Sequence, residues 1–324
     1  MTLTTTAPPG LPATNPLQPV QRTGRSDRVF RGLTLCCGLL VLAILGLIAV
    51  TTTRQAWPAF SHDGIRFFTN TRWAPSAQVF GSLAFVFGTV TTAVIALVLA
   101  VPVSIGIALF LSDVAPRRLR RPVSALVDLL AVIPSVVYGL WGIIVFAPWV
   151  SGVYNRVGEL TKPISVLSTL FAGPSSGRAL FTAGIIFALM ITPIITSLTR
   201  EVFDTVPAMG KEAAYALGST RWEMIRASVF PHSKAGMIGA VMLGLGRAMG
   251  ETIAAALVIG SSPQITAHLF RSGDSMAGVI ANQFGESGGI HRSALIGLGV
   301  ELFALTILVN IVARIVVARG LRNA

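Results

Sequence analysis

The sequence is poor in charged residues and in cysteine. Charged side chains make up 12% of its 324 residues and hydrophobic ones 53%, whereas soluble globular domains have about 25% charged residues. A chain with so little polar surface is suited to a lipid bilayer rather than to water. Its two cysteines, Cys36 and Cys37, are adjacent in an apolar run. They therefore offer neither a disulfide framework nor a metal-ligand spacing.

The sequence also lacks the motifs of common enzymes. It contains no GxxxxGK[ST] loop, so it offers no P-loop for ATP, and no HExxH or GxSxG pattern. Its four histidines share no ligand spacing. A membrane-embedded enzyme that uses Glu251 or Glu301 as acid or base is one alternative. It would need a nucleophile or a metal cluster, which the sequence does not offer.

The net charge of +12 is distributed between apolar stretches. Basic loops flanking membrane spans explain this pattern, and we expect no nucleic-acid partner. If the N-terminus is cytoplasmic, the inner segments hold about twice as many Lys and Arg residues as the outer ones. The positive-inside rule then predicts that both termini are cytoplasmic.

Apolar stretches of spanning length predict an all-α integral membrane protein with six transmembrane helices. The six stretches are 32–53, 81–111, 123–149, 179–199, 237–260 and 293–317. Pro134 predicts a break in the third. Residues 1–28 are rich in Pro and Thr and predict a disordered cytoplasmic tail. The transmembrane domain is then 29–320.

The segment 200–236, between the fourth and fifth spans, is longer than most helix connections. It predicts one helix over 208–217 that Gly218 ends, and a second that starts with a Thr220–Glu223 capping box. In the second helix Trp222, Ile225 and Val229 form an apolar stripe, and Pro231 is expected to end it. The stripe packs either on the protein's own bundle or on a cytoplasmic partner.

Several residues of this segment resemble the EAA loop of ABC-importer permeases. They are Glu212-Ala213-Ala214, Gly218 and Phe230-Pro231, although Ser228 and Phe230 stand where the family has Ile and Leu. The resemblance implies the ABC importer permease fold, with cytoplasmic coupling helices between spans four and five. It also implies that an ATPase subunit binds here, with Glu212, Ala213, Ala214, Gly218, Trp222 and Pro231 as the coupling residues.

A closer resemblance, to PstC-type phosphate permeases, extends over about 29–318. It is carried by Phe80-Gly81-Ser82-Leu83, Gly88-Thr89, Ala100-Val101-Pro102, the run from Ile133 to Gly142, and the run from Gly244 to Thr252. The sister PstA-type subunit shares several of these motifs. The resemblance implies a bacterial inner-membrane channel subunit that passes inorganic phosphate, and it leaves sulfate or molybdate open.

The same resemblance implies the partners. They are a sister PstA-type permease, two PstB-type ATPase subunits that bind ATP and Mg, a PstS-type phosphate-binding protein and membrane lipid. No cofactor is expected in this chain itself. A sensor module in contact with phosphate signalling is a further alternative.

Four ionisable residues fall within the predicted spans: Asp128, Arg247, Glu251 and Glu301. Charges in a bilayer are costly, and they persist when they pair or line a polar path. Arg247 and Glu251 are four residues apart, which predicts an ion pair on one helix face. The pair either only locks helices together or lets Arg247 contact a passing oxyanion. The resemblance implies that both residues are required for phosphate movement.

The other polar residues in the spans carry weaker expectations. Glu301 falls at a depth between those of Arg247 and Glu251, and we expect it to be a second partner for Arg247. Ser135 and Tyr138 follow the Pro134 break and are expected to line the substrate path, because a broken spanning helix must face a cavity or protein. Asp128 is assigned to stabilisation of a helix N-terminus.

Overall fold

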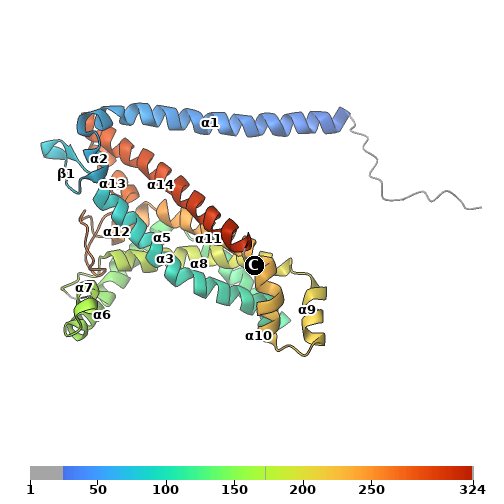
Figure 1. Cartoon of the computed structure of the whole chain (residues 1–324). Coiled ribbons are helices and arrows are strands. Elements are labelled where there is room, and N and C mark those ends of the chain that lie inside the picture. The colour runs from blue at the N-terminus through green and yellow to red at the C-terminus, as the bar shows by residue number, and fades with distance from the viewer. Residues whose placement is uncertain (1–24, 172, 323–324) are drawn as a thin grey trace, which may run out of the picture. The chain divides into compact units, whose positions relative to one another are not determined.

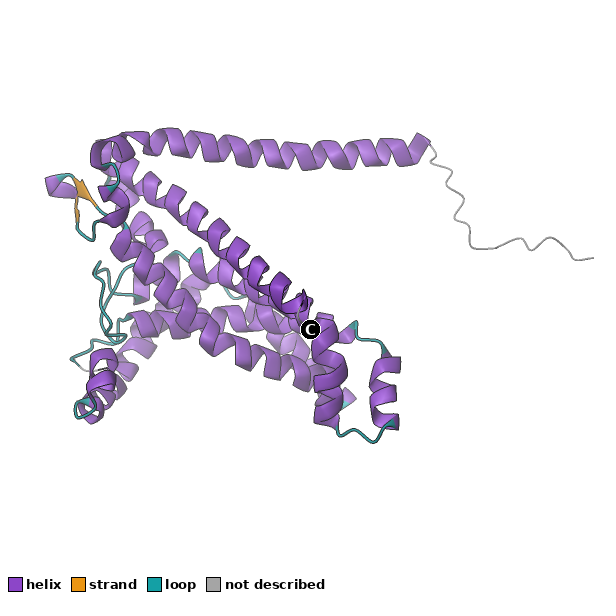
Figure 2. Ribbon diagram, in the orientation of Figure 1, coloured by secondary structure: helices purple, strands orange, loops and turns teal. Residues whose placement is uncertain are grey.

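The computed structural model describes residues 25–171 and 173–322, and most of these are helical (Figures 1 and 2). Two units are distinguished, the first ending at Val50 and the second beginning at Thr51. The predicted tail, 1–28, lies outside the described residues as far as position 24, and helix α1 (Arg25–Asp63) begins at Arg25. In the first unit α1 is an uninterrupted apolar helix, as an anchor in lipid requires.

Within the described residues, five helices are long and apolar enough to cross a membrane. They run over Asp27–Asp63, Leu83–Val114, Ser135–Thr161, Leu180–Asp204 and Gly289–Ile315. Four of the predicted spans fall largely within the first, second, fourth and fifth of these helices. The predicted count of six spans is not confirmed, because the third and fifth predicted spans are built differently.

The third predicted span is broken at Pro134, as expected. Helix α4 (Arg117–Val132) ends there, and Ile133 and Pro134 are extended, with ψ of 126° and 139°. Proline forces the residue before it out of the helical region, which explains the break. The apolar path then runs through α5 (Ser135–Trp141), the π turn η3 (Gly142–Phe146) and α6 (Ala147–Thr161).

The fifth predicted span, 237–260, is not one helix. Helix α11 (Phe230–Met249) ends at Gly250, and α12 (Ile253–Val258) begins three residues later. The run before the break contains Gly244, Gly246 and Gly250, and glycine has low helix propensity. A continuous helix was therefore the wrong interpretation of an apolar but glycine-rich stretch.

The centre of the second unit is formed by α3 (Leu83–Leu109), α8 (Leu180–Asp204) and α11. Small residues bring these helices close together. A Cβ added at Gly184 would stand 2.4 Å from Cγ2 of Ile95, and one at Gly244 would stand 2.7 Å from Cδ1 of Ile195. Close backbone approach of this kind is how helices associate in membranes.

One end of the second unit carries a small aromatic cluster. Strands β1 (Trp73–Ala74) and β2 (Val79–Phe80) pair antiparallel and flank the 3₁₀ turn η1 (Pro75–Ala77). Trp73 and Phe80 pack there edge to face. The cluster also includes α2 (Arg66–Thr69), α13 (Met276–Gln283) and α14 (Gly289–Arg322). Two further short elements are α7 (Ser165–Phe171), which lies at the same end as β1 in Figure 1, and η5 (Phe284–Glu286), which follows α13 directly.

The opposite end of the second unit carries the segment predicted to be a coupling loop (Figure 1). It consists of α9 (Ala208–Ala216), α10 (Arg221–Met224) and the π turn η4 (Ile225–Val229). The chain continues from η4 directly into α11. This end is held to the bundle by a buried cluster that includes Ala108, Phe203 and Val229.

Candidate functional site

The two helix breaks lie side by side, because α5 packs against α12. A Cβ added at Gly139 would stand 3.0 Å from Cα of Ala254, and one at Gly142 would stand 2.9 Å from Cγ2 of Val258. The contacts advance in the same direction along both helices, so α5 and α12 run parallel. Their N-terminal breaks therefore lie at the same level of the bundle, where non-helical backbone must face protein or a cavity.

Glu251 lies in the second break and caps α12. Its Oε1 accepts a hydrogen bond from the backbone N–H of Ala254 at 3.3 Å. This bond satisfies one of the free amides at the start of a helix. The predicted ion pair with Arg247 is wrong: among the described residues Arg247 makes no ion pair. The reason is that α11 ends at Met249, so the two residues do not share a helix face.

Arg247 lies in the last turn of α11, where a cation is favourable to the helix dipole. Its exposed side chain lines a groove of about 1000 Å³ between α11 and α14. The remaining groove wall includes Met242, Leu243 and Gly246 of α11, and Ile307, Asn310 and Arg314 of α14. The guanidinium is thus available to an anion in the groove.

Tyr138 connects the first break to this arginine. Its hydroxyl donates a hydrogen bond across the break to the carbonyl of Leu130, at 3.1 Å. It also lies close enough to Arg247 to feel its charge. Ser135, the first residue of α5, is half-buried at the same break. The structure therefore brings four predicted pathway residues, Ser135, Tyr138, Arg247 and Glu251, to the two adjacent breaks.

Glu301 does not belong to this group. Its Oε2 is buried and has no hydrogen-bond partner, and its neighbour is Ser82 at the start of α3. The groove beside Arg247 meets α14 only from Ile307 onward, which is about 9 Å further along the helix. The predicted pairing of Glu301 with Arg247 is therefore wrong. On α14, Glu301 lies beside Ser82, whereas Arg247 faces the part of the helix from Ile307 onward.

The assignment of Asp128 to a helix N-terminus is also wrong, because α4 begins at Arg117 and Asp128 lies in its second half. Its Oδ1 accepts a hydrogen bond from Ser197 at 3.1 Å, and its Oδ2 lies 3.9 Å from Nη2 of Arg200. Asp128 thus connects α4 to α8.

The predicted start and stop signals of the coupling loop are present. Gly218 has φ of +81°, the left-handed conformation that ends a helix. The Thr220–Glu223 capping box is formed, with Thr220 N–H donating to Oε2 of Glu223 at 2.8 Å. The backbone N–H of Thr220, and then its hydroxyl, hold the pKa of Glu223 below its usual range.

The predicted end of the second coupling helix at Pro231 is wrong. The helix continues through η4 into α11, and Pro231 occupies the first turn of α11. A proline lacks the N–H that a regular helix interior uses, and the π turn immediately before it changes the local hydrogen-bond pattern. The chain can therefore pass Pro231 without leaving the helix.

The predicted apolar stripe divides between two surroundings. Ile225 and Val229 are buried on the protein's own bundle, whereas Trp222 is 60% exposed. Of the EAA residues, Glu212 and Ala213 are exposed and Ala214 is half-buried. Two residues were missed from the sequence: Met209 and Leu217 are 79% and 88% exposed. The sequence did offer a signal for them, because Met209 and Leu217 are large apolar residues in a segment predicted to be cytoplasmic.

Comparison with known proteins supports a transport role. A family model described as "Binding-protein-dependent transport system inner membrane component" matches residues 100–321. The chain is 43% identical over 302 residues to "Phosphate transport system permease protein PstC" of Mesorhizobium japonicum, covering 93% of this chain and 92% of that one. It is 41% identical to the protein of the same name from Haemophilus influenzae, covering 90% and 93%.

Solved structures resemble the fold at low sequence identity. A bacterial ABC transporter involved in the import of the acidic polysaccharide alginate matches with a TM-score of 0.55 and 18% identity, covering 90% of this chain and 98% of that one. The inward-facing MetNI methionine ABC transporter matches with a TM-score of 0.52 and 17% identity, covering 76% and 99%. The fold is thus that of ABC transporter permeases.

Proposed function

Because this chain belongs to the family of binding-protein-dependent transport system inner membrane components, we propose that it is the membrane-spanning subunit of an ATP-driven importer of inorganic phosphate. The observation that carries the choice of phosphate is the 43% identity, over 93% of the chain, to a protein named as a phosphate permease. The inner membrane follows from the family and from the apolar helices.

The geometry around Arg247 supports passage of an oxyanion. A guanidinium offers a planar fork of donors that matches two phosphate oxygens, whereas an ammonium acts as a point charge. Arg247 lies beside two helix breaks and has no anionic partner among the described residues. Because the groove is open, the anion can also leave, as conduction requires.

The proposed assembly contains a sister permease, two ATPase subunits and a phosphate-binding protein, with both termini of this chain cytoplasmic. Met209, Leu217 and Trp222 support an ATPase contact, because they expose apolar surface at the end of the bundle that carries the EAA-like residues. ATP and Mg would be bound by those ATPase subunits. In this proposal the chain performs no chemistry of its own.

Radiolabelled phosphate uptake tests the proposal in phosphate-starved cells that lack this gene. Wild type is expected to restore uptake. Arg247→Gln at matched membrane levels is expected not to, and Arg247→Lys to restore it partly. If neither wild type nor variants restore uptake while all partners are present, phosphate is the wrong anion, and sulfate and molybdate uptake are measured instead. Equal restoration by wild type and Arg247→Gln would assign Arg247 a structural role.

A further inference from the structure

The contacts of helix α9 with the bundle include an ion pair and an apolar contact on the same face. Nζ of Lys211 lies 2.7 Å from Oδ1 of Asp113, with side chains 22% and 9% exposed. One turn further along α9, Ala214 packs on the cluster that includes Phe203 and Val229. Such a shielded pair is screened less than an exposed one. A shift of α9 therefore acts directly on Asp113.

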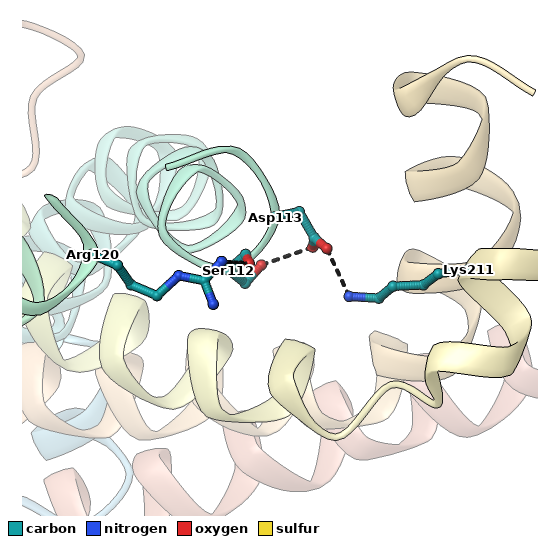
Figure 3. A network of polar contacts seen from close by, with 4 residues as sticks. All are labelled: Ser112, Asp113, Arg120 and Lys211. Atoms are coloured by element: carbon teal, nitrogen blue, oxygen red, sulfur yellow. Dashed lines mark hydrogen bonds and ion pairs between the residues drawn. The ribbon is translucent and has the colours of Figure 1, made fainter. Parts of the chain in front are cut away.

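Asp113 belongs to the π turn η2 (Phe110–Val114), which follows α3. Its Oδ2 accepts a hydrogen bond from the Ser112 hydroxyl at 2.8 Å. The carbonyl of Ser112 accepts one from the guanidinium of Arg120, in the first turns of α4. Figure 3 shows Asp113 between Ser112 and Lys211, with Arg120 reaching towards Ser112 from the other side. The turn η2 thus joins α9 to α4.

Helix α4 can transmit a displacement from η2 to the Pro134 break, because it is one helix between them. Its 16 residues make a rod about 24 Å long. Among its described side chains only Val127 is buried, while Leu126, Leu129 and Val132 are 60%, 65% and 77% exposed. Within this chain, α4 therefore buries few of its own side chains along its length. Asp128 gives it polar contacts with Ser197 and Arg200 of α8.

The far end of α4 reaches the candidate substrate path. The carbonyl of Leu130 accepts the hydrogen bond of the Tyr138 hydroxyl, and Tyr138 lies within electrostatic range of Arg247. The Pro134 break lies between Leu130 and Tyr138. A displacement of α4 along its axis would therefore change the geometry of the break beside Arg247.

We propose that Lys211, Asp113 and Arg120 are positioning residues that transmit movement of α9 through α4 to the Pro134 break. The inference rests on the proposed function, in which an ATPase moves α9. Lys211 moves Asp113, η2 and Arg120 carry the shift into α4, and the Leu130–Tyr138 bond delivers it to the path. Without the Lys211–Asp113 pair, ATP hydrolysis continues in the ATPase but fewer anions cross for each ATP.

The first test measures phosphate uptake and ATP hydrolysis together in proteoliposomes that hold the complete importer. Lys211→Met and Asp113→Asn are each expected to lower uptake per ATP hydrolysed by about fivefold or more. The exchange Lys211→Asp with Asp113→Lys is expected to recover most of the loss. Lys162→Met is the matched control, because Lys162 is exposed at the end of α6, remote from α9. Equal falls in uptake and hydrolysis, with no recovery on exchange, would overturn the proposal.

The second test does not depend on which anion is carried. Val136→Cys, with Cys36 and Cys37 replaced by Ala, places a thiol next to the break, where Val136 is 37% exposed. Its labelling by a water-soluble maleimide is expected to differ between the nucleotide-free and vanadate-trapped complexes. The difference should disappear with Lys211→Met and return in the charge-exchanged pair. An undiminished difference with Lys211→Met overturns the proposal, whereas a failure of wild type to import phosphate overturns only the choice of anion.

Discussion

Arg247 and Glu301 are both ionisable residues in apolar helices, yet their surroundings are opposite. Arg247 is exposed to a groove beside two helix breaks. Glu301 has a buried oxygen without a hydrogen-bond partner, and its neighbour is Ser82. An unpaired buried polar group reduces stability. The same sequence signal thus marks an exposed, anion-accessible cation in one case and a carboxyl with one buried, unpaired oxygen in the other.

Replacing Glu301 is therefore expected to stabilise the protein. Glu301→Gln keeps the shape of the side chain and removes the cost of burying a charge without a cation, so we expect a Tm increase of about 2–4 °C with phosphate uptake unchanged. Thermal unfolding of the purified protein checks this. Glu286→Gln, at an exposed position, is the control and should leave Tm unchanged. A loss of uptake in a well-folded Glu301→Gln protein would contradict this assignment.

Asp274 is a second buried carboxyl, outside the spanning helices. It is 4% exposed, and burial raises its pKa to about 6, while the backbone N–H of Ser275 acts in the opposite direction. The folded protein therefore holds the proton more tightly than the unfolded chain. The resulting stabilisation is complete below about pH 4 and is lost as the pH rises through about 6.

Asp274→Asn is expected to remove this pH dependence. The variant keeps the acceptor for Ser275 and carries no charge. It should be more stable than wild type at pH 7.5, by up to about 3 kcal/mol for a pKa difference of about two units, and close to wild type at pH 4. Unfolding curves at both pH values check this, with the exposed Asp204→Asn as control. An equal gain at both pH values would show that titration of Asp274 is not the cause.

At the scale of elements, the coupling helices and the broken helices show which local signals are reliable. The capping box at Thr220 and the stop at Gly218 were predictable because both act within one turn of backbone. The Pro134 break was predictable for the same reason. The end of α11 at Gly250 was not predicted. Low helix propensity of glycine favours an end there, but packing against neighbouring helices can override propensity, so the sequence alone does not decide.

The capping box predicts the effect of one substitution in the coupling segment. Thr220→Ala removes the hydroxyl that accepts from the backbone of Glu223, and we expect a loss of about 1 kcal/mol of local stability. Faster amide hydrogen exchange over 221–224 would report it. Thr220→Ser keeps the hydroxyl and should exchange as wild type does. Unchanged exchange in Thr220→Ala would mean that packing of Met224 and Ile225 alone holds this turn.

At the scale of the whole molecule, the second unit has exposed apolar faces suited to lipid and to other subunits. Val98 on α3 and Leu243 on α11, for example, are 66% and 62% exposed. A water-soluble monomer rarely exposes so much apolar surface. The two ends of the second unit, α9 with α10 and the β1–β2 hairpin, are expected to face opposite sides of the membrane.

This topology predicts a labelling result. With Cys36 and Cys37 replaced by Ala, Leu217→Cys and Ser76→Cys each place one thiol at an exposed position, at opposite ends of the unit. A membrane-impermeant maleimide added to intact spheroplasts should label Ser76→Cys, and should label Leu217→Cys only after permeabilisation. The reverse pattern would place the coupling segment outside. Labelling of both without permeabilisation would contradict a spanning second unit.

The sequence by itself determined the class of protein, the positions of most apolar helices, the Pro134 break and the start of the second coupling helix. These depend on composition and on interactions within one or two turns of the chain. Only the tertiary structure decided that α5 and α12 run side by side, that Glu251 caps α12 and does not pair with Arg247, and that Glu301 lies elsewhere. It alone joined Lys211 to Asp113, 98 residues away along the chain. Contacts over such separations arise when helices pack, and no local pattern in the sequence specifies them.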